Sequence, residues 1–407
     1  MVVMKVVQIN TIHKFKSTGR NCYEMEQFLL KNGHECVTAF GHGKKVAENA
    51  YRINTEFEYK MHALFSLLFG LEGYFSVFAT IRLISFLKKY KADVIHLHNL
   101  HGHYLNLPIF FRYLRKSKIP IVLHLHDCWI MSGGCSHPTA HDCNGWLLKC
   151  GNCPAKREYP SSLLFDFTRK MQKDKQKWFS KLSRAQVVGV SKWVADEGAK
   201  CYLNHFPITY VYNWINNKVF YPRNSDILAR YGLDNDKFNI ICVSAIWGED
   251  SDRYRDLLKL ADLLEDDMQI VTVGKVNAPI EHERIKYIGF TDSTDQLAEL
   301  YSACDAYVHL STADTFGKVI AEAMACGIPA VVYDRTACPE VVGEGCGYSI
   351  PAHNMAALLE KLNLIKEKGK GAFTENCVSR VSQNFNYEKN CEKTLDIYET
   401  LINDSKK

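Results

Sequence analysis

The amino-acid sequence predicts an α/β protein made of two similar, doubly wound halves. Short β-branched runs alternate with amphipathic helical stretches, an order typical of parallel sheets that are covered by helices. This alternation starts again after Asn217, so the pattern occurs twice. The chain has 407 residues, of which 47% are hydrophobic and 23% are charged, and this length is more than one small hydrophobic core requires.

The first half begins with a β-branched strand at residues 4–9, a loop that contains Ser17-Thr18-Gly19-Arg20, and a helix at residues 21–31. Asn32-Gly33 ends this helix, since glycine readily takes the left-handed conformation found at helix C-termini. Helical stretches separate several of the strands that follow, which predicts a largely parallel sheet. These strands are expected at residues 35–39, 94–97, 119–125, 187–190 and 209–212.

The second half repeats the alternation after an Asn-rich turn at residues 212–217. We expect an N-terminal domain at residues 1–216 and a C-terminal domain at residues 217–385. The segment 386–407 contains a last helical stretch with no strand after it, and its periodicity leaves open whether it packs back on the N-terminal domain. The expected strands of the second half are residues 239–244, 269–273, 285–288, 306–310 and 330–333, with helices at 256–264 and 295–302.

Charge and targeting signals narrow the range of functions. The formal net charge of +5 is small for a chain of 407 residues, and it lacks the concentrated basic character of nucleic-acid-binding proteins, so we expect no nucleic-acid partner. The N-terminus enters a strand at once, whereas a signal peptide needs a basic start and a longer apolar core. We therefore expect a cytoplasmic protein.

One apolar segment leaves two interpretations open. Residues 61–69 and 74–86 are richly apolar, but Glu72 and Arg82 interrupt them before the roughly 18 to 20 apolar residues that are needed to cross a bilayer. Either the segment forms a buried pair of helices, or it forms an interfacial face that rests on anionic lipid. The second interpretation would make the protein peripheral on the inner face of the membrane.

The most informative stretch runs from Asp314 to Pro329 and predicts a loop, a short helix, a glycine stop and a strand. A helix that starts near Phe316 offers unpaired N–H groups and the positive end of its dipole to an anion such as a diphosphate. Glu322 lies eight residues after Asp314, about two turns into the helix, and carboxylates suit sugar hydroxyls. The alternative is a charged helix cap followed by an ordinary helix glutamate.

This stretch resembles the signature of family 4 glycosyltransferases, in which an acidic residue and seven others precede a run of the form Glu-Ala-Met-Ala-Cys-Gly-x-Pro. Gln8-Ile9-Asn10 with Ser17-Thr18-Gly19-Arg20, residues 94–102 and residues 124–129 resemble the branch that acts in bacterial capsule and exopolysaccharide assembly. The resemblance covers most of the chain. It implies a GT-B fold, in which two Rossmann-like domains face each other across a cleft, and it implies retention of anomeric configuration.

The resemblance also implies roles for individual residues. The acceptor would be held by the N-terminal half and the nucleotide sugar mainly by the C-terminal half. Glu322 would hold the ribose hydroxyls, Asp314 would hold the sugar hydroxyls, and His126 would lie beside the anomeric region. Packing and hydrogen bonding at strand ends are the alternative for His126 and its neighbouring histidines. Further expected contacts are the backbone of Phe316, Gly317 and Lys318 around the sugar and diphosphate, Gly19 near the phosphates, the backbone at Gly289 and Phe290 near the donor, and Arg20, His101 and Tyr104 near the acceptor.

A transfer of this kind needs no enzyme nucleophile and no catalytic cofactor; its expected partners are a nucleotide sugar and a lipid-linked or oligosaccharide acceptor. Negative charge builds on the departing diphosphate, so fixed dipoles and cations near the phosphates matter most. The family's usual phosphate clamp is an arginine and a lysine, but this sequence has Ala245 and Arg253 in those places. The lost cation motivates a catalytically silent scaffold subunit as one alternative, and a sugar-nucleotide epimerase is another.

Four cysteines lie within nineteen residues of Gly/Asn-rich sequence with little periodicity: Cys135, Cys143, Cys150 and Cys153. Four thiolates at short spacing suit tetrahedral zinc, which would stabilise a loop that has little core of its own. Free thiols and disulfides are the alternatives, and nearby histidines are substitute ligands. A catalytic zinc is not expected, since four cysteines would leave no open coordination position.

Overall fold

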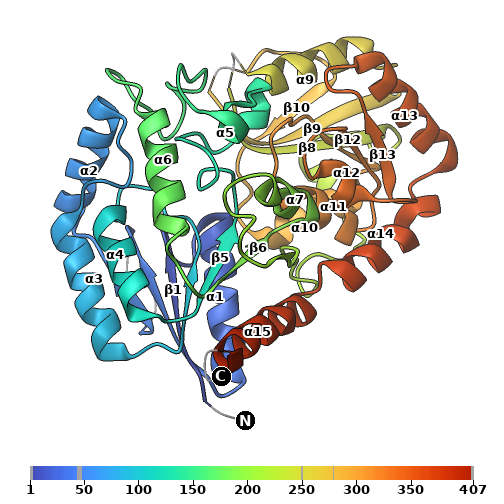
Figure 1. Ribbon diagram of the computed structural model, residues 1–407. Coiled ribbons are helices and arrows are strands. Elements are labelled where there is room, and N and C mark those ends of the chain that lie inside the picture. The colour runs from blue at the N-terminus through green and yellow to red at the C-terminus, as the bar shows by residue number, and fades with distance from the viewer. Residues whose placement is uncertain (1–2, 44–47, 249–250, 278, 405–407) are drawn as a thin grey trace. The chain divides into compact units, whose positions relative to one another are not determined.

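The computed structural model describes residues 3–43, 48–248, 251–277 and 279–404. The chain divides into two compact units (Figure 1). The N-terminal unit comprises Met1–Val211 with Cys391–Lys407, and the C-terminal unit comprises Tyr212–Asn390. Each unit contains a sheet of parallel strands flanked by helices, which confirms the predicted fold class. Across the described ranges, no helix is both long enough and apolar enough to cross a membrane.

The sheet of the N-terminal unit has seven strands in the order β3-β2-β1-β4-β5-β6-β7. All neighbouring strands are parallel. The order changes direction between β1 and β4, which is where ligands bind in doubly wound sheets. The sequence pattern does not predict the short edge strand β3. The strands are β1 (Lys5–Asn10), β2 (Glu35–Phe40), β3 (Ala50–Arg52), β4 (Val94–Leu97), β5 (Ile121–Leu125), β6 (Ala185–Gly189) and β7 (Ile208–Tyr210).

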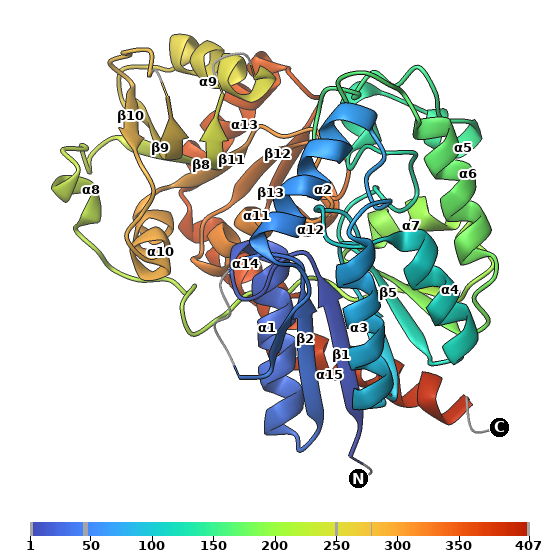
Figure 2. The ribbon, with the colours of Figure 1, turned by 90° about the vertical axis from the view of Figure 1, so that its left-hand side faces the viewer.

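The first helix starts earlier than the sequence predicts. The sequence predicts a loop at residues 17–20, but helix α1 (Lys16–Lys31) includes them, and it lies beside β1 and β2 (Figure 2). The chain turns sharply before the helix, where Lys14 has a φ of 68°. A Cβ atom on Gly19 would lie only 3.1 Å from Ile12 Cγ1. Gly19 therefore lets the first turns of the helix pack closely against the segment that precedes it.

The apolar segment forms helices α2 (Glu56–Phe69) and α3 (Val77–Tyr90). Helix α3 buries Leu83 and Leu87 completely, whereas Phe78 is 75% exposed. The helix pair is therefore buried on one side and exposes apolar side chains on the other. The large apolar side chains exposed on these helices are Phe57, Leu64, Leu67, Phe69, Val77, Phe78 and Ile81. The other helices of this unit are η1 (Pro138–His141), α4 (Leu107–Ser117), α5 (Gly145–Leu148), α6 (Thr168–Phe179) and α7 (Lys192–Ala199).

The C-terminal unit has a six-stranded sheet in the order β10-β9-β8-β11-β12-β13, again parallel throughout. The sequence pattern does not predict β13, whose residues Gly-Tyr-Ser-Ile carry little β-branched character. The strands are β8 (Phe238–Trp247), β9 (Met268–Val276), β10 (Ile285–Ile288), β11 (Ala306–His309), β12 (Ala330–Tyr333) and β13 (Gly347–Ile350). The helices are α8 (Ile227–Arg230), α9 (Asp252–Leu263), α10 (Thr294–Ala303), α11 (Lys318–Ala325), α12 (Cys338–Val342), α13 (Met355–Lys368) and α14 (Gly371–Asn384).

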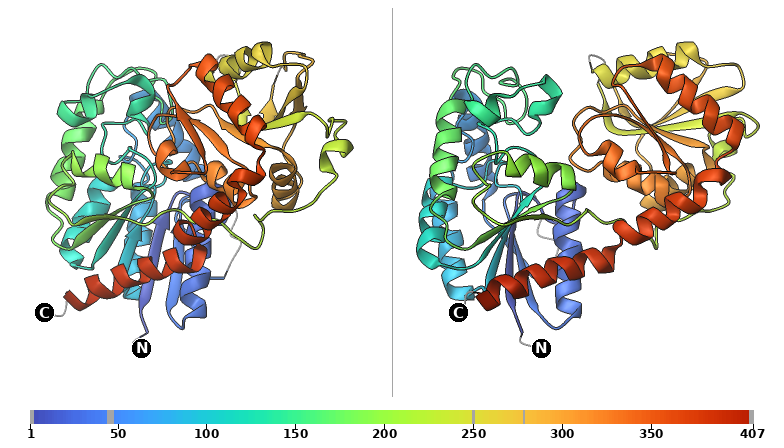
Figure 3. Two further views of the ribbon diagram at one scale, coloured as in Figure 1. Left: turned by 90° about the vertical axis from the view of Figure 1, so that its right-hand side faces the viewer. Right: turned by 45° about the vertical axis from the view of Figure 1, so that its right-hand side comes forward.

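The last helix, α15 (Tyr387–Asp404), returns to the N-terminal unit (Figure 3). The hydroxyl of the buried Tyr398 lies 2.6 Å from Nδ1 of His96 on β4. The chain passes between the units twice, and close to these two passages, inside the C-terminal unit, the Ile215 N–H donates to the Phe385 carbonyl over 2.8 Å. The boundaries expected near residues 216 and 385 fall beside this hydrogen bond, a few residues from the division of the two units.

Candidate functional site

In the C-terminal unit, an acidic side chain is held where β11 ends. Asp314 Oδ2 lies 2.6 Å from Nε2 of His309, and the Tyr307 hydroxyl lies 2.9 Å from His309 Nδ1. Because a carboxylate only accepts, His309 Nε2 carries the hydrogen and donates it to Asp314. Burial alone would raise the pKa of Asp314, but the contact with His309 outweighs it and keeps that pKa well below its usual range. Asp314 is therefore an oriented anion at this strand end.

The cation Arg253, on α9, joins the ends of two strands. Its Nη1 atom donates to Ser244 Oγ over 2.6 Å, and its Nε atom donates to the Leu310 carbonyl over 3.2 Å. Ser244 lies on β8 and Leu310 directly follows β11, so the guanidinium is fixed at the carboxyl edge of the sheet. Arg253 also contributes to the low pKa of Asp314. An anion and a cation thus lie together at the edge where parallel sheets bind ligands.

Helix α11 begins at Lys318, and the expected start near Phe316 is wrong by two residues. Gly317 caps the helix with a φ of 74°, and a Cβ atom there would lie 2.6 Å from Ile320 Cδ1. The Phe316 side chain is 2% exposed and packs edge-on against Phe385 at 5.2 Å between ring centroids. Only the backbone of Phe316 can therefore take part in ligand binding.

Glu322 lies on the second turn of α11 and is 7% exposed. Two further residues with expected donor contacts follow β10 at the same sheet edge. The Gly289 carbonyl accepts from the Gly274 N–H over 3.2 Å, which ties the end of β10 to β9. The Phe290 side chain is 67% exposed. Its ring is a large apolar surface that can stack on a flat ligand.

In the N-terminal unit, four buried histidines stack where β4 and β5 end. We call His96, His98, His124 and His126 the histidine cluster; their neighbouring ring centroids are 4.0 to 5.2 Å apart. Burial lowers the pKa of His96, His98 and His124, and the pKa of His124 falls to about 4. These three rings are therefore neutral near pH 7. His98 Nδ1 lies 2.8 Å from His126 Nε2, so His126 belongs to the same hydrogen-bonded set.

The structure places the residues with expected acceptor contacts in different surroundings. His101 Nε2 lies 2.7 Å from Asp127 Oδ2; burial would raise the pKa of Asp127, but His101 lowers it to about 2. Asp127 therefore pairs with His101. Tyr104 is fully buried and donates to the Asn99 carbonyl over 2.6 Å, so the expected acceptor contact of its side chain is wrong. Arg20 lies in α1 and is partly exposed.

Sequence reasoning missed the role of Glu72, which it treated only as an interruption of an apolar stretch. Glu72 accepts from the N–H groups of Gly102 and His103 over 3.0 and 2.8 Å, and from His103 Nδ1 over 2.6 Å. Burial would raise its pKa, but His62 and His103 keep that pKa well below its usual range. The carboxylate therefore fixes the loop after β4. A charge inside an apolar stretch is a usable signal, because a buried carboxylate must find partners.

The four clustered cysteines precede α6 and form no disulfide with one another. Cys135 and Cys153 share a hydrogen bond that raises the pKa of Cys135 and lowers the pKa of Cys153 to about 7. The Gly133 N–H donates to Cys150 Sγ over 3.2 Å. Cys143 and Cys153 add to the effect of burial in raising the pKa of Cys150. The four thiols are thus coupled, but the compact groups with metal-ligand spacing in the described part of the chain, such as His96, His98 and His124, lie elsewhere.

Two Rossmann-like units, one with oriented charges at its ligand edge and the other with buried hydrogen-bonding rings, define a protein of the GT-B class. Solved GT-B structures match nearly the whole chain. Sucrose-phosphate synthase from Thermosynechococcus elongatus has a TM-score of 0.70 at 16% identity and covers 98% of this chain and 99% of its own. Anabaena Alr3699/HepE in complex with UDP-glucose has a TM-score of 0.67 at 16% identity, with 98% of this chain and 100% of its own covered.

The chain belongs to the family 4 glycosyltransferases: "Glycosyltransferase Family 4" matches residues 18–218, and "Glycosyl transferases group 1" matches residues 226–381. The putative colanic acid biosynthesis glycosyl transferase WcaC of Escherichia coli K12 is 24% identical over 282 residues, which is 66% of each chain. O-antigen chain mannosyltransferase B of Escherichia coli is 30% identical over 119 residues, which is 29% of this chain and 30% of its own. The chain thus spans about two thirds or less of the length of these curated relatives.

Proposed function

We propose that this protein is a retaining glycosyltransferase that moves a sugar from a nucleotide-sugar donor to a lipid-linked or oligosaccharide acceptor in bacterial surface polysaccharide synthesis. The observation that carries this proposal is the oriented pair of charges at the carboxyl edge of the C-terminal sheet, Asp314 beside Arg253, next to the start of α11. The relatives named for colanic acid and O-antigen synthesis support the setting. The UDP-glucose complex of HepE supports a nucleotide-sugar donor.

In this mechanism the donor binds at the carboxyl edge of the C-terminal sheet. Asp314 accepts from hydroxyls of the sugar, Glu322 accepts from the ribose, and Arg253 with the backbone N–H groups at 316–318 stabilises the charge that grows on the diphosphate. The bond from C1 to the phosphate oxygen breaks while the acceptor oxygen bonds to C1 from the same face. A donor phosphate oxygen takes the acceptor's proton, so no side chain forms a bond to the sugar.

The test is release of nucleoside diphosphate from a panel of nucleotide sugars, with the full chain and with three variants. Asp314→Asn and Glu322→Gln each remove a negative charge at nearly constant size, and turnover is expected to fall in both. Asp266→Asn is the matched control in the same unit, since the Asp266 side chain is 99% exposed. Unchanged turnover in both site variants would refute the site, and a wild-type chain that turns over no nucleotide sugar would refute the function.

A catalytically silent scaffold is the second candidate, and Ala245 favours it because this position lacks one cation of the family's usual phosphate clamp. Calorimetry with nucleoside diphosphates separates the two functions: binding by the wild-type chain that weakens in Arg253→Ala supports the transferase, and no binding supports the scaffold. A sugar-nucleotide epimerase would convert its substrate without an acceptor. Identification of the product as an epimerised nucleotide sugar would therefore replace the proposal.

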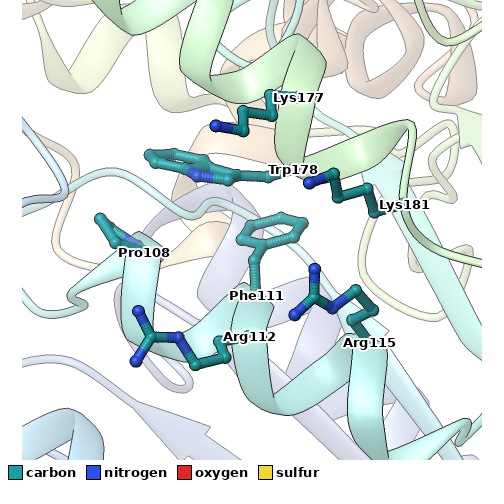
Figure 4. Close-up of a pocket in the computed structure, with 7 residues that line it drawn as sticks. All are labelled: Pro108, Phe111, Arg112, Arg115, Lys177, Trp178 and Lys181. Atoms are coloured by element: carbon teal, nitrogen blue, oxygen red, sulfur yellow. The ribbon is translucent and has the colours of Figure 1, made fainter.

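The open apolar face of α2 and α3 supports peripheral contact with the inner face of the membrane, where a lipid-linked acceptor lies. Nearby, α4 and α6 form a hollow of about 240 Å³, in which the stacked rings of Phe111 and Trp178 lie among cationic side chains (Figure 4). The cations that line the hollow are Arg112, Arg115, Lys177 and Lys181. Apolar surface beside clustered cations suits an anionic lipid surface.

Vesicle flotation tests this contact. Binding to vesicles that contain phosphatidylglycerol is expected to exceed binding to neutral phosphatidylcholine vesicles and to weaken with salt. The double variant Phe57→Ser with Phe78→Ser is expected to lose binding. Ile280→Ser is the control, because Ile280 is 52% exposed on the C-terminal unit. Equal flotation of all three proteins would exclude these helices as the contact.

A structural zinc held by Cys135, Cys143, Cys150 and Cys153 is proposed on the basis of their spacing and their coupled thiols. Such an ion would cross-link the segment before α6 and take no part in the chemistry. Metal analysis of the purified chain is expected to find about one zinc per chain, and a chelator is expected to increase hydrogen exchange in residues 135–153. Absence of zinc from a well-folded chain would leave the free-thiol alternative.

A further inference from the structure

Gln8, on β1, has an amide whose orientation is fixed. Its Nε2 atom donates to the Cys22 backbone carbonyl over 2.8 Å, and its Oε1 atom lies 3.2 Å from Nε2 of His98. A backbone carbonyl only accepts, so exchanging the two ends of the amide would place two acceptor oxygens against each other. Thr38 Oγ1 lies 3.4 Å from the same Nε2 atom and accepts there, because its own hydrogen goes to the Glu26 carboxylate at 2.5 Å.

The orientation of Gln8 determines where the proton lies on His98. Since Gln8 Oε1 accepts, His98 Nε2 must carry a hydrogen. Burial, together with His96 and His124, lowers the pKa of His98 well below its ordinary value, so the ring is neutral and its Nδ1 atom has no hydrogen. That atom can only accept, and it lies 2.8 Å from His126 Nε2.

His126 must therefore donate from Nε2 to His98, whatever its own charge. If His126 is neutral, its lone pair is on Nδ1; if it takes up a proton, that proton goes to Nδ1. A rotation of the ring by 180° would place a carbon atom against His98 Nδ1 and lose the hydrogen bond. The two nitrogens of an imidazole point in widely different directions, so Nδ1 is directed away from His98.

We infer that Gln8 and His98 are positioning residues that hold His126 in the Nε2–H tautomer. Which nitrogen of a histidine reacts is commonly set by the hydrogen bond that the other nitrogen makes. The tautomer is a property of the folded N-terminal unit, and only the role of His126 beside the donor sugar rests on the proposed function. A ring that is set in advance needs no reorganisation when the ligand arrives.

The other half of the histidine cluster provides an internal contrast. His96 Nε2 lies 3.1 Å from His124 Nδ1, and His96 Nδ1 lies 2.6 Å from the Tyr398 hydroxyl. A hydroxyl can donate or accept, so this branch has no fixed direction. The tautomer of His126 is therefore expected to depend on Gln8 and not on Tyr398.

The first test observes the tautomer directly. The full chain is labelled with ¹⁵N-histidine, and long-range ¹H–¹⁵N correlations are recorded at about pH 7.5, where an unperturbed histidine is mostly neutral. The His126 signals are assigned by their loss in His126→Gln. We expect a protonated Nε2 and an unprotonated Nδ1. A protonated Nδ1 with an unprotonated Nε2, or an average of the two tautomers, would overturn the inference, and both outcomes are independent of enzymatic turnover.

The second test changes the positioning residue. His98→Leu leaves no acceptor for His126, and we expect both tautomers of His126 to appear and kcat to fall about tenfold, as for one lost hydrogen bond. His98→Asn retains an amide group close to the former Nδ1 atom and is expected to restore a single tautomer and part of kcat. Tyr398→Phe is the control, with an unchanged His126 signal. A single Nε2–H tautomer and normal kcat in a folded His98→Leu protein would overturn the inference; should that variant not fold, the wild-type spectrum decides alone.

Discussion

The ligand edges of the two sheets differ in their chemistry. The edge of the N-terminal sheet carries the buried, hydrogen-bonded rings of the histidine cluster beside the Asp127–His101 pair, and that of the C-terminal sheet carries Asp314 and Arg253 as charges. Burial explains the difference, since fully buried imidazoles lose their charge, whereas the Asp314 side chain is 34% exposed and has His309 as a partner. In a transfer that separates charge, the hydrogen-bonded rings of the N-terminal domain would thus orient the ligand. The charges of the C-terminal domain would supply electrostatic stabilisation.

Acidification should affect the two units unequally, and this is the largest expected effect. The pKa values of His96, His98 and His124 are lowered by burial, to about 4 for His124. Below about pH 6.5 the unfolded chain therefore binds protons that the folded unit does not bind, so stability falls as the pH falls from about 6.5 to 4, by up to about 1.4 kcal/mol per pH unit for each ring. Above about pH 6.5 this contribution to stability is fully present.

Hydrogen exchange measured at several pH values, corrected for the intrinsic rate, checks this prediction. Peptides from β4 and β5 should lose protection at a higher pH than peptides from β11 and β12. The raised pKa of His103 arises from Glu72, which outweighs the opposing effect of burial. His103 adds no pH dependence of stability between about pH 6.5 and 4, because the stability that it contributes is fully present below the pKa of histidine in the unfolded chain. Simultaneous loss of protection in both units would contradict a selective effect of the histidine cluster.

Removing the charge of the C-terminal edge should have the next largest effect. Asp314→Asn keeps an oxygen that accepts from His309 but loses the negative charge, and kcat should fall about 10²- to 10³-fold, as for other oriented electrostatic groups. Asp127→Asn is the matched change at the N-terminal edge, where His101 is the partner. It should mainly raise the KM for the acceptor. Equal losses of kcat in both variants would contradict the proposal that the two sheet edges have different roles.

The sequence predicts best those strands that contain β-branched residues. The strands at residues 94–97, 285–288 and 330–333 have the predicted bounds, whereas β3 and β13 are short edge strands with weak patterns. The start of α1 was also missed, because a positive φ at Lys14 has no signature in a lysine. Local propensity therefore defines the sheets, and the turns between elements depend on packing.

The candidate site also has features that the sequence predicts and others that it does not. Histidines two residues apart on a strand share a face, so the spacing of His96 with His98 and of His124 with His126 already favours two columns of rings. Two pairings join residues that are 26 and 90 positions apart, namely Asp127 with His101 and Gln8 with His98. A pattern of neighbouring residues cannot predict such pairings. The buried Tyr104 shows the converse: a polar residue in a motif can serve the core.

Arg253 provides a smaller and more specific test of the charged edge. Arg253→Ala should weaken binding of a nucleoside diphosphate about 10- to 100-fold, which corresponds to about 1.5–3 kcal/mol for hydrogen bonds to a charged group. Arg253→Lys retains the charge but cannot reach Ser244 and Leu310 together, because an ammonium lacks the planar fork of a guanidinium. Calorimetry should therefore rank the affinities as wild type, then lysine, then alanine. An affinity of the lysine variant equal to that of alanine would mean that geometry, and not charge, holds the phosphates.

The smallest expected effects come from the two glycines at helix starts, one in each unit. Gly317→Ala places a Cβ atom 2.6 Å from Ile320 Cδ1 at a φ of 74°, and the left-handed conformation alone costs about 1–2 kcal/mol. Gly19→Ala meets Ile12 and His13 at 3.1 and 3.3 Å without a left-handed φ, so its cost should be about 1 kcal/mol or less. Urea unfolding checks this order. A stable Gly19→Ala protein with weakened nucleotide binding would place the phosphates beside α1, whereas unchanged binding would leave Gly19 with a packing role alone.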